Sequence, residues 1–85
     1  MFTDPDQPLV RASLEGDLQA FERLVARHRD VVFRVVARLV ADDHEAEDLT
    51  QDTFLRAFHR LERYRGEAPS RSWLLRIATT RQSRM

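Results

Sequence analysis

Residues 18–41 read LQAFERLVARHRDVVFRVVARLVA, and this stretch decides the fold. Side chains suited to a core recur along it at alternating steps of three and four residues, at Leu18, Phe21, Val25, His28, Val32, Val35 and Leu39. Four more apolar residues widen the same stripe, namely Leu24, Val31, Val36 and Val40. This period is that of an α-helix with one apolar face, and it outweighs the strand preference of the many valines. The stretch therefore predicts a long amphipathic helix with a broad buried face, on which His28 is interpreted as a core histidine.

The residues before this helix carry the signals of one helix end and one helix start. Gly16 is of the type that follows a helix C-terminus, and Asp17 is of the type that caps a helix N-terminus. We expect a short first helix over 7–15, with Pro8 in its first turn. Residues 1–6 are interpreted as an N-terminal tail outside the domain.

A third helix is expected over 44–64, with Asp42 or Asp43 as its N-cap. Its predicted core face consists of Ala46, Leu49, Thr50, Thr53, Phe54, Ala57 and Leu61. Acidic residues in the first turn complement the helix dipole there, and arginines follow towards the C-terminal end, which favours cations.

The one clear loop covers 65–69, and Ser70 suits the N-cap of a last helix over 71–84. The inward face of that helix is predicted to hold Trp73, Leu74, Ile77 and Ala78. No stop signal precedes Met85, so we interpret the chain as a domain cut from a longer protein. With two glycines and three prolines in 85 residues, turn residues are too few for an all-β domain. The prediction is an all-α fold, a compact bundle of three to four helices over residues 7–85.

The composition excludes several classes of protein. The absence of cysteine excludes disulfides and thiolate metal sites. Charged residues make up 33% of the chain, and it contains no run of about 20 apolar residues that could span a membrane. The acidic N-terminus lacks the basic-then-apolar pattern of a secretion signal. We therefore expect a soluble cytoplasmic protein without a membrane partner.

Motifs for catalysis are missing as well. His28, His44 and His59 are 16 and 15 residues apart, so none is paired at metal-ligand spacing. The sequence has neither a glycine-rich phosphate loop nor a nucleophile motif. We expect a protein that is not an enzyme and that has no metal site and no cofactor.

The net charge of zero hides two oppositely charged halves. Residues 1–52 hold twelve Asp and Glu against six Arg, a balance of −6, and residues 53–85 hold eight Arg against two Glu, a balance of +6. Such a split indicates two different partner surfaces. In the acidic half, one helix face carries Asp48, Gln51, Asp52 and Leu55. This face is either a solvated surface or a docking surface for a basic partner, with Leu55 as its apolar anchor.

The basic half gathers seven of its eight arginines around the predicted loop. They are Arg60, Arg63, Arg65, Arg71, Arg76, Arg81 and Arg84. Tyr64 and Trp73 stand among them, and arginine beside an aromatic ring suits single-stranded nucleic acid, because the cations neutralise phosphates while the ring stacks on a base. The alternative is that both rings cover one end of the core. We favour the core for Trp73, and both interpretations stay open for Tyr64.

Several of these stretches together resemble one known family. Residues 46–58, AEDLTQDTFLRAF, resemble the polymerase-binding segment of extracytoplasmic-function (ECF) sigma factors. Residues 20–25 with His28 resemble the start of the same domain, region 2 of these factors. Residues 64–67 and 73–78 resemble its −10-element loop and recognition helix. The resemblance covers about residues 7–80, with the motifs in the family's order and spacing.

The resemblance implies a role for each surface in transcription initiation. Asp48, Gln51 and Asp52 match the positions that contact the clamp coiled coil of the β′ subunit of RNA polymerase, and Leu55 lies on the same face. The loop 64–71 matches the part that captures an unpaired base of the non-template strand of the −10 promoter element. The residues expected to bind DNA at this end of the domain are Arg60, Arg63, Tyr64, Arg65, Arg71, Arg76, Thr79 and Thr80.

Two departures from the family fall in the DNA-reading part. Ser70 and Arg71 stand where the family often has aromatic residues, and Thr80 stands where it often has Asn. The family's C-terminal domain, which reads the −35 element, is absent from this sequence, and an anti-sigma factor is a further partner that the resemblance admits. A helical protein–protein interaction domain without nucleic-acid binding stays open as the alternative. A helix-turn-helix repressor is disfavoured, because no second helix of suitable length follows a short turn.

Overall fold

The computed structural model describes residues 4–64, 66 and 68–80 of the chain. Within them the chain forms helices only, which confirms the predicted all-α fold. The elements are α1 (Gln7–Leu14), α2 (Leu18–Ala37), α3 (Asp43–Arg60), the 3₁₀ turn η1 (Leu61–Arg63) and α4 (Ser70–Thr79). None of the described helices is both long enough and apolar enough to cross a membrane.

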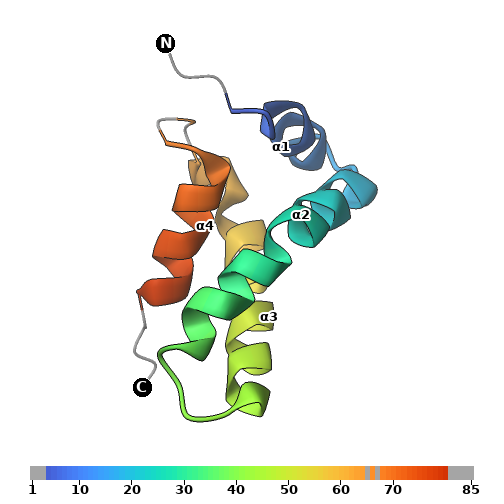
Figure 1. The fold of residues 1–85 in the computed structure, drawn as a ribbon. Helices are drawn as coiled ribbons and strands as arrows, with labels where there is room; N and C mark the ends of the chain where they lie inside the picture. The colour runs from blue at the N-terminus through green and yellow to red at the C-terminus, as the bar shows by residue number, and fades with distance from the viewer. Residues whose placement is uncertain (1–3, 65, 67, 81–85) are drawn as a thin grey trace.

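The bundle is built on α2 and α3. Helix α3 runs back beside α2, α4 packs against both, and α1 packs against α2 (Figure 1). The main core lies between α2, α3 and α4, where Val32 and Val36 of α2 have no exposed surface. A second cluster joins Val10 of α1, Leu24 of α2 and Leu61 of η1. Because Leu61 belongs to this cluster, α1 and the segment that follows α3 are tied together at one end of the bundle.

The predicted caps of the two long helices are confirmed. The Asp17 carboxylate accepts hydrogen bonds from the backbone N–H groups of Gln19 and Ala20, at 3.0 and 3.2 Å. Of the two candidates before α3, Asp42 is the cap, and its side chain accepts from Glu45 N at 2.8 Å. Each bond satisfies an N–H group that has no partner within its own helix.

The predicted end of the second helix is wrong by four residues. Helix α2 ends at Ala37 rather than near Ala41, because the next two backbone N–H groups bond three residues back, Arg38 to Val35 O and Leu39 to Val36 O. Such bonds tighten the last turn and break the helical period. Leu39 is therefore 57% exposed instead of buried, and Leu18, at the first position of α2, is 62% exposed.

The other two ends also differ from the prediction. Helix α3 stops at Arg60; of the expected helical residues after it, 61–63 form η1 and Tyr64 is extended. Helix α4 stops at Thr79, and the expected continuation over 81–84 lies outside the described residues. Ser70 is the first residue of α4 rather than its N-cap, because Pro69 takes that position and offers no capping side chain.

Candidate functional site

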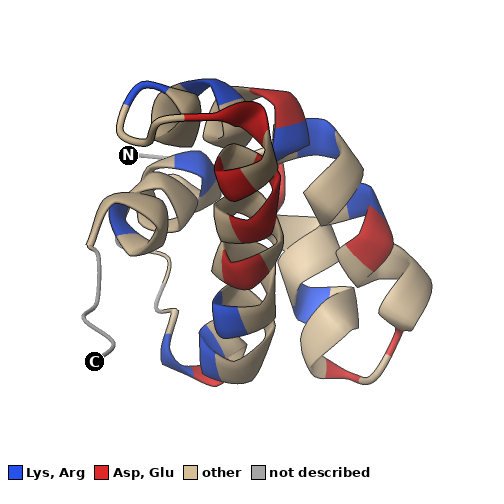
Figure 2. Cartoon of the chain, turned by 90° about the horizontal axis from the view of Figure 1, so that it is seen from below, with Lys and Arg blue, Asp and Glu red and all other residues tan. Residues whose placement is uncertain are grey.

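The acidic face of α3 points to solvent. Asp48 and Gln51 are exposed, Leu55 is 59% exposed, and the Asp52 side chain is 43% exposed. Figure 2 shows the acidic residues along the first half of α3 and basic residues towards its end. The four predicted polymerase-contacting side chains are thus available together on one helix face.

One of the carboxylates on this face is already paired. Arg56 donates to Asp52 Oδ2 at 2.9 Å, one helical turn along α3. Exposed pairs of this kind stabilise a helix by only about 0.3–0.5 kcal/mol. Asp48 has no ion pair within the described part of the chain. Asp48 is therefore the carboxylate that a basic partner can reach without displacing an arginine.

Next to the acidic face, an apolar groove of about 760 Å³ runs between α2 and α3. Gln51 and Leu55 line its edge, and the exposed Leu18 and Phe58 line it further. The rings of Phe58 and Phe21 meet edge to face, with centroids 5.1 Å apart. Leu55 was predicted at this surface, whereas Leu18 was predicted in the core and Phe58 was not among the predicted site residues. Phe58 follows Leu55 by three residues, and this spacing predicts that the two side chains lie on the same helix face.

Near the C-terminal end of α3, residues 4–6 lie over the start of α4 (Figure 1). Asp4 and Asp6 are 7% and 3% exposed, although residues 1–6 were predicted to form a tail outside the domain. Asp4 Oδ2 accepts from the backbone N–H of Ser70 at 2.9 Å and from the Tyr64 hydroxyl at 3.1 Å. Since Pro69 provides no capping side chain, Asp4 satisfies the first N–H group of α4 from the other end of the chain.

Asp6 makes a second set of contacts next to the first. Its Oδ2 accepts from Ser70 Oγ at 2.6 Å and contacts His28 Nε2 at 2.5 Å, and its Oδ1 pairs with Arg27. On the other side of the imidazole, Arg71 Nε donates to His28 Nδ1 at 3.2 Å. Because the guanidinium can only donate, the His28 ring proton must lie on Nε2, which then donates to Asp6.

His28 is buried as predicted, at 3% exposed, but it also connects α2 to Asp6 and to α4. We refer to the contacts of Asp4 and Asp6 with Arg27, His28, Tyr64 and Ser70 as the N-terminal clasp. Its signal in the sequence is weak and consists of a histidine on an apolar stripe, which requires a polar partner.

The clasp shifts three pKa values. Burial raises the pKa of Asp4, but hydrogen bonds from the backbone N–H groups of Asp6 and Ser70 outweigh it and hold that pKa below its usual value. Burial likewise opposes the hydrogen bonds from Ser70, His28 and Arg27 at Asp6, whose pKa is also lowered. Burial and the Asp4 carboxylate together raise the pKa of Tyr64 to about 12. The carboxylates stay charged and the phenol neutral across the physiological range.

Tyr64 combines the two interpretations that the sequence left open. Its ring is half-buried against the cluster of Val10, Leu24 and Leu61, and its centroid lies 5.0 Å from that of Trp73. Trp73 itself packs against both clusters, which confirms its place in the core. Tyr64 also borders a surface cleft, so it is both part of the core and accessible from outside.

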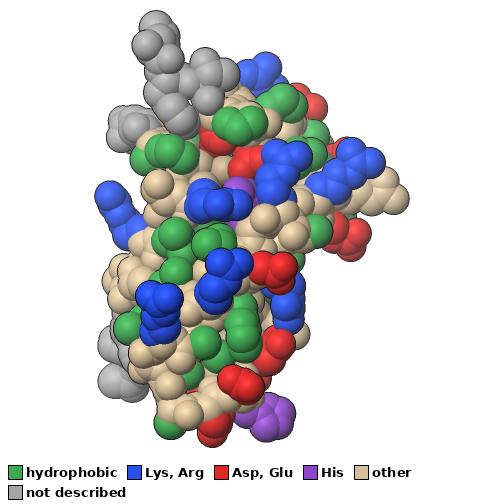
Figure 3. Space-filling model, viewed as in Figure 1, with side chains coloured by type: hydrophobic (Ala, Val, Ile, Leu, Met, Phe, Trp, Pro, Cys, Tyr) green, Lys and Arg blue, Asp and Glu red, His purple; other side chains and the backbone are tan. Residues whose placement is uncertain are grey.

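The predicted DNA-binding residues form two groups. Arg60, Arg63 and Arg71 are exposed near the loop, whereas Arg65 lies outside the described residues. Arg76, Thr79 and Thr80 are exposed towards the far end of α4, and both threonine hydroxyls donate to backbone carbonyls one turn back. Figure 3 shows arginine side chains spread over α2 and α4, with hydrophobic surface between them.

The family of the chain follows from comparison with known proteins. Residues 24–84 match the family model of sigma-70 region 2. The chain belongs to the sigma-70 region 2 family. This region 2 domain is 36% identical over 75 residues to the RNA polymerase sigma-H factor of Pseudomonas aeruginosa. The match covers 88% of the chain and 39% of that protein. It is 40% identical over 79 residues to the ECF RNA polymerase sigma factor SigE of Mycolicibacterium smegmatis. That match covers 87% of the chain and 30% of SigE.

A solved structure shares the fold as well. The "1.8 A structure of RsbN-BldN complex" contains a chain with 37% identity and a TM-score of 0.76, covering 81% of this region 2 domain and 51% of that chain. The region 2 domain spans between 30% and 39% of the length of the two sigma factors named above. It is a domain of the ECF sigma factors, which are transcription initiation factors rather than enzymes. Within the described residues, no group of side chains is arranged to hold a metal ion.

Proposed function

We propose that this region 2 domain docks on the clamp coiled coil of the β′ subunit of RNA polymerase. The observation that carries the proposal is Leu55, which is 59% exposed beside Asp48 and Gln51 at the edge of the apolar groove. A face that only solvates a helix needs no exposed leucine. A basic helical partner can bury Leu55 in the contact while its cations pair with Asp48. Together, the two contacts fix the register and the orientation of the partner helix on α3.

The second half of the proposal is that the end of the bundle near the clasp binds the unpaired non-template strand of the −10 element. Arg60, Arg63 and Arg71 are exposed there and can neutralise phosphates, and Tyr64 offers an aromatic surface to a base. The proposed polymerase contacts lie along α3, whereas the proposed DNA contacts lie at its last residue, in and after η1 and at the start of α4, so one domain can hold polymerase and DNA together. Binding of the exposed strand supplies the free energy that opens the duplex, and no nucleotide hydrolysis is needed.

A protein inhibitor is a third partner under this proposal. The similar solved structure is a complex of two proteins, RsbN and BldN. An anti-sigma factor that covers the groove between α2 and α3 would compete directly with polymerase, because Gln51 and Leu55 belong to both contacts.

Charge reversal at Asp48 tests the docking half. Asp48→Arg places a cation against the basic partner, and we expect at least about a tenfold loss of affinity for core polymerase. Asp30→Arg is the matched control, because Asp30 is exposed on α2 and is not among the groove residues. Equal affinity of the two variants in a pull-down or anisotropy titration would show that the α3 face does not contact polymerase.

Salt dependence tests the DNA half. Removal of a phosphate-binding arginine, as in Arg63→Ala, should lower the slope of log affinity against log salt for a −10 non-template oligonucleotide by about 0.7. A domain that only pairs with proteins would instead form salt-labile oligomers, which sedimentation at several salt concentrations detects, and would not bind the strand.

A further inference from the structure

Arg71 differs from the other proposed DNA-binding arginines in how its side chain is held. Its Nε donates a hydrogen bond to Nδ1 of His28 at 3.2 Å, although Arg71 itself is exposed at the start of α4. Arg60, Arg63 and Arg76 make no side-chain hydrogen bond or ion pair to any residue that the structure describes. A guanidinium presents its N–H donors in a rigid, planar fork, so a bond at Nε leaves the donors on Nη1 and Nη2 for a ligand.

The imidazole that holds Arg71 is itself fixed. His28 is buried, and its Nε2 contacts Asp6 Oδ2 at 2.5 Å. Asp6 in turn accepts from Ser70 Oγ at 2.6 Å and pairs with Arg27, so its carboxylate cannot turn away from the ring. Because Asp6 takes the ring proton on Nε2, the lone pair of Nδ1 is left to accept from Arg71.

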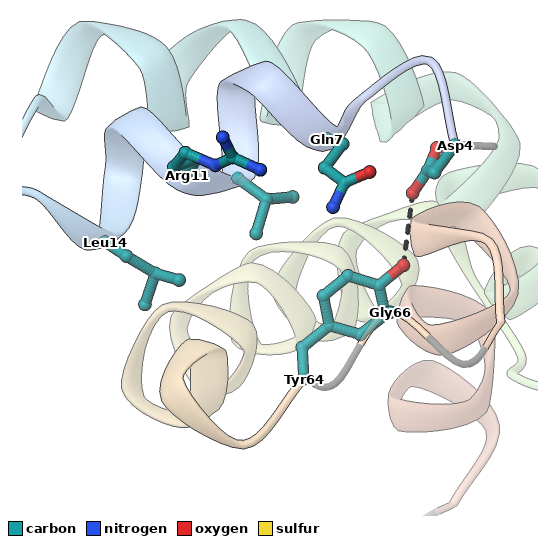
Figure 4. A pocket seen from close by; sticks show the side chains of 7 residues that line it. Asp4, Gln7, Arg11, Leu14, Tyr64 and Gly66 are labelled. Carbon is teal, nitrogen blue, oxygen red and sulfur yellow. Dashed lines mark hydrogen bonds between the residues drawn. The ribbon is translucent and has the colours of Figure 1, made fainter.

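The backbone before Arg71 is held by the same N-terminal segment. The N–H group of Ser70 donates to Asp4 Oδ2 at 2.9 Å. The same oxygen accepts from the Tyr64 hydroxyl at 3.1 Å (Figure 4). Residues 4–6 therefore fix the point from which the Arg71 side chain departs and, through His28, the place where its guanidinium begins. Within the described residues, Arg71 makes no ion pair that would compete for its outer N–H groups.

We propose that His28 is a positioning residue for DNA binding, which holds Arg71 so that its guanidinium presents Nη1 and Nη2 to a phosphate of the non-template strand. Asp6 supports this role because it fixes the ring proton on Nε2. A fork that is already in place loses less conformational entropy when it binds a phosphate through two hydrogen bonds. The inference rests on the proposed DNA binding and adds to it two buried residues, His28 and Asp6, that do not touch the strand themselves.

Two amide substitutions at His28 separate positioning from packing. In His28→Gln, the amide lies near the place of Nε2 and can still donate to Asp6, but nothing accepts from Arg71. In His28→Asn, the shorter side chain puts its amide oxygen near the place of Nδ1, so Arg71 keeps its acceptor while Asp6 loses a donor. We expect His28→Gln to lower affinity for the strand by about 2- to 10-fold, the cost of ordering one long side chain, and His28→Asn to retain affinity within about twofold. Fluorescence anisotropy of a −10 non-template oligonucleotide measures this affinity on core polymerase carrying each variant.

A double-mutant cycle shows whether the effect of His28 passes through Arg71. In the Arg71→Ala background, His28→Gln should have no further effect on affinity for the strand, because the side chain that it positions is gone. In the Arg63→Ala background, His28→Gln should keep its full effect. Arg63 is the matched control because it is an exposed, proposed DNA-binding arginine without a side-chain bond in the described part of the chain.

The outcomes separate this inference from the proposed function. If the unaltered chain does not bind the strand at all, the proposed DNA binding fails and the positioning role fails with it. If the chain binds the strand but Arg71→Ala leaves the affinity unchanged, DNA binding stands and the role of His28 is wrong. Equal losses from His28→Gln in the two arginine backgrounds, or equal losses in His28→Gln and His28→Asn, would show that His28 acts on the fold as a whole and would overturn the inference.

Discussion

The carboxylate of Asp4 accepts a hydrogen bond from the backbone N–H of Ser70 at 2.9 Å, across 66 residues of sequence. Through this contact, the start of α4 depends on a side chain from the other end of the chain. The same carboxylate oxygen accepts from Tyr64, so it also fixes the residue from which the loop departs. The shape of the proposed DNA-binding end of the bundle is thus set partly by residues that precede α1.

Replacing Asp4 should destabilise the domain as the loss of a helix cap does. In Asp4→Ala, the first N–H group of α4 and the Tyr64 hydroxyl both lose their acceptor, and we expect a loss of about 1–2 kcal/mol in the free energy of unfolding. Urea denaturation followed by circular dichroism measures it. Asp30→Ala should stay within about 0.5 kcal/mol of the unaltered chain. A loss at Asp4 no larger than at Asp30 would contradict the long-range cap.

Asp6 gives the domain an acid-sensitive contribution to stability. Because its pKa is lowered in the folded state, its carboxylate stabilises the fold above the usual aspartate pKa of about 3.9, and the contribution is lost as pH falls through the lowered value. Asp6→Asn should therefore be less stable than the unaltered chain at neutral pH. The difference should shrink below about pH 4. Urea midpoints measured between neutral and acid pH test this, and a difference that does not change with pH would refute it.

The raised pKa of Tyr64 predicts a second pH-dependent contribution to stability, at alkaline pH. Its pKa is raised to about 12 in the folded state, so the contribution of its hydroxyl is complete below the usual tyrosine pKa of about 10 and is lost as pH rises towards 12. The chain has one tyrosine, so absorbance of the phenolate reports this group alone. Asp4→Asn should lower the midpoint, because it removes the negative charge beside the hydroxyl. An unaltered midpoint in that variant would mean that Asp4 does not act on Tyr64.

The pair of Arg56 and Asp52 predicts a gain of affinity rather than a loss. Arg56→Ala frees the Asp52 carboxylate and removes a cation from a face proposed to meet a basic partner. We expect polymerase to bind about twofold more tightly, the equivalent of the 0.3–0.5 kcal/mol of such a pair. Arg23→Ala on α2 controls for the change in net charge. Weaker binding of Arg56→Ala would show instead that Arg56 itself contacts polymerase.

Local signals predicted most of the fold. Asp17 and Asp42 act on N–H groups two or three residues away, so their roles can be read from neighbouring sequence. The end of α2 was missed because no glycine or proline marks it; valines continue to Val40 beyond the last helical turn. Leu39 is exposed because α2 ends two residues before it.

The candidate site was predictable only in part, for a related reason. Gln51 and Leu55 lie on one helix face, and spacing along α3 was enough to group them. The clasp joins residues 21 to 66 positions apart, and no periodicity connects Asp6 to His28 or Asp4 to Ser70. Such pairs become visible only once α1, α2 and α4 have been packed together.

The most direct test of the central claim is the affinity of the chain for core polymerase, measured with and without a −10 non-template oligonucleotide. If one face of the domain binds polymerase while the other end grips unpaired DNA, the chain should bind core polymerase by itself, and the oligonucleotide should tighten that binding by the same factor by which polymerase tightens the oligonucleotide. A chain that fails to bind core polymerase, or whose affinity is the same with and without the strand, would contradict the account.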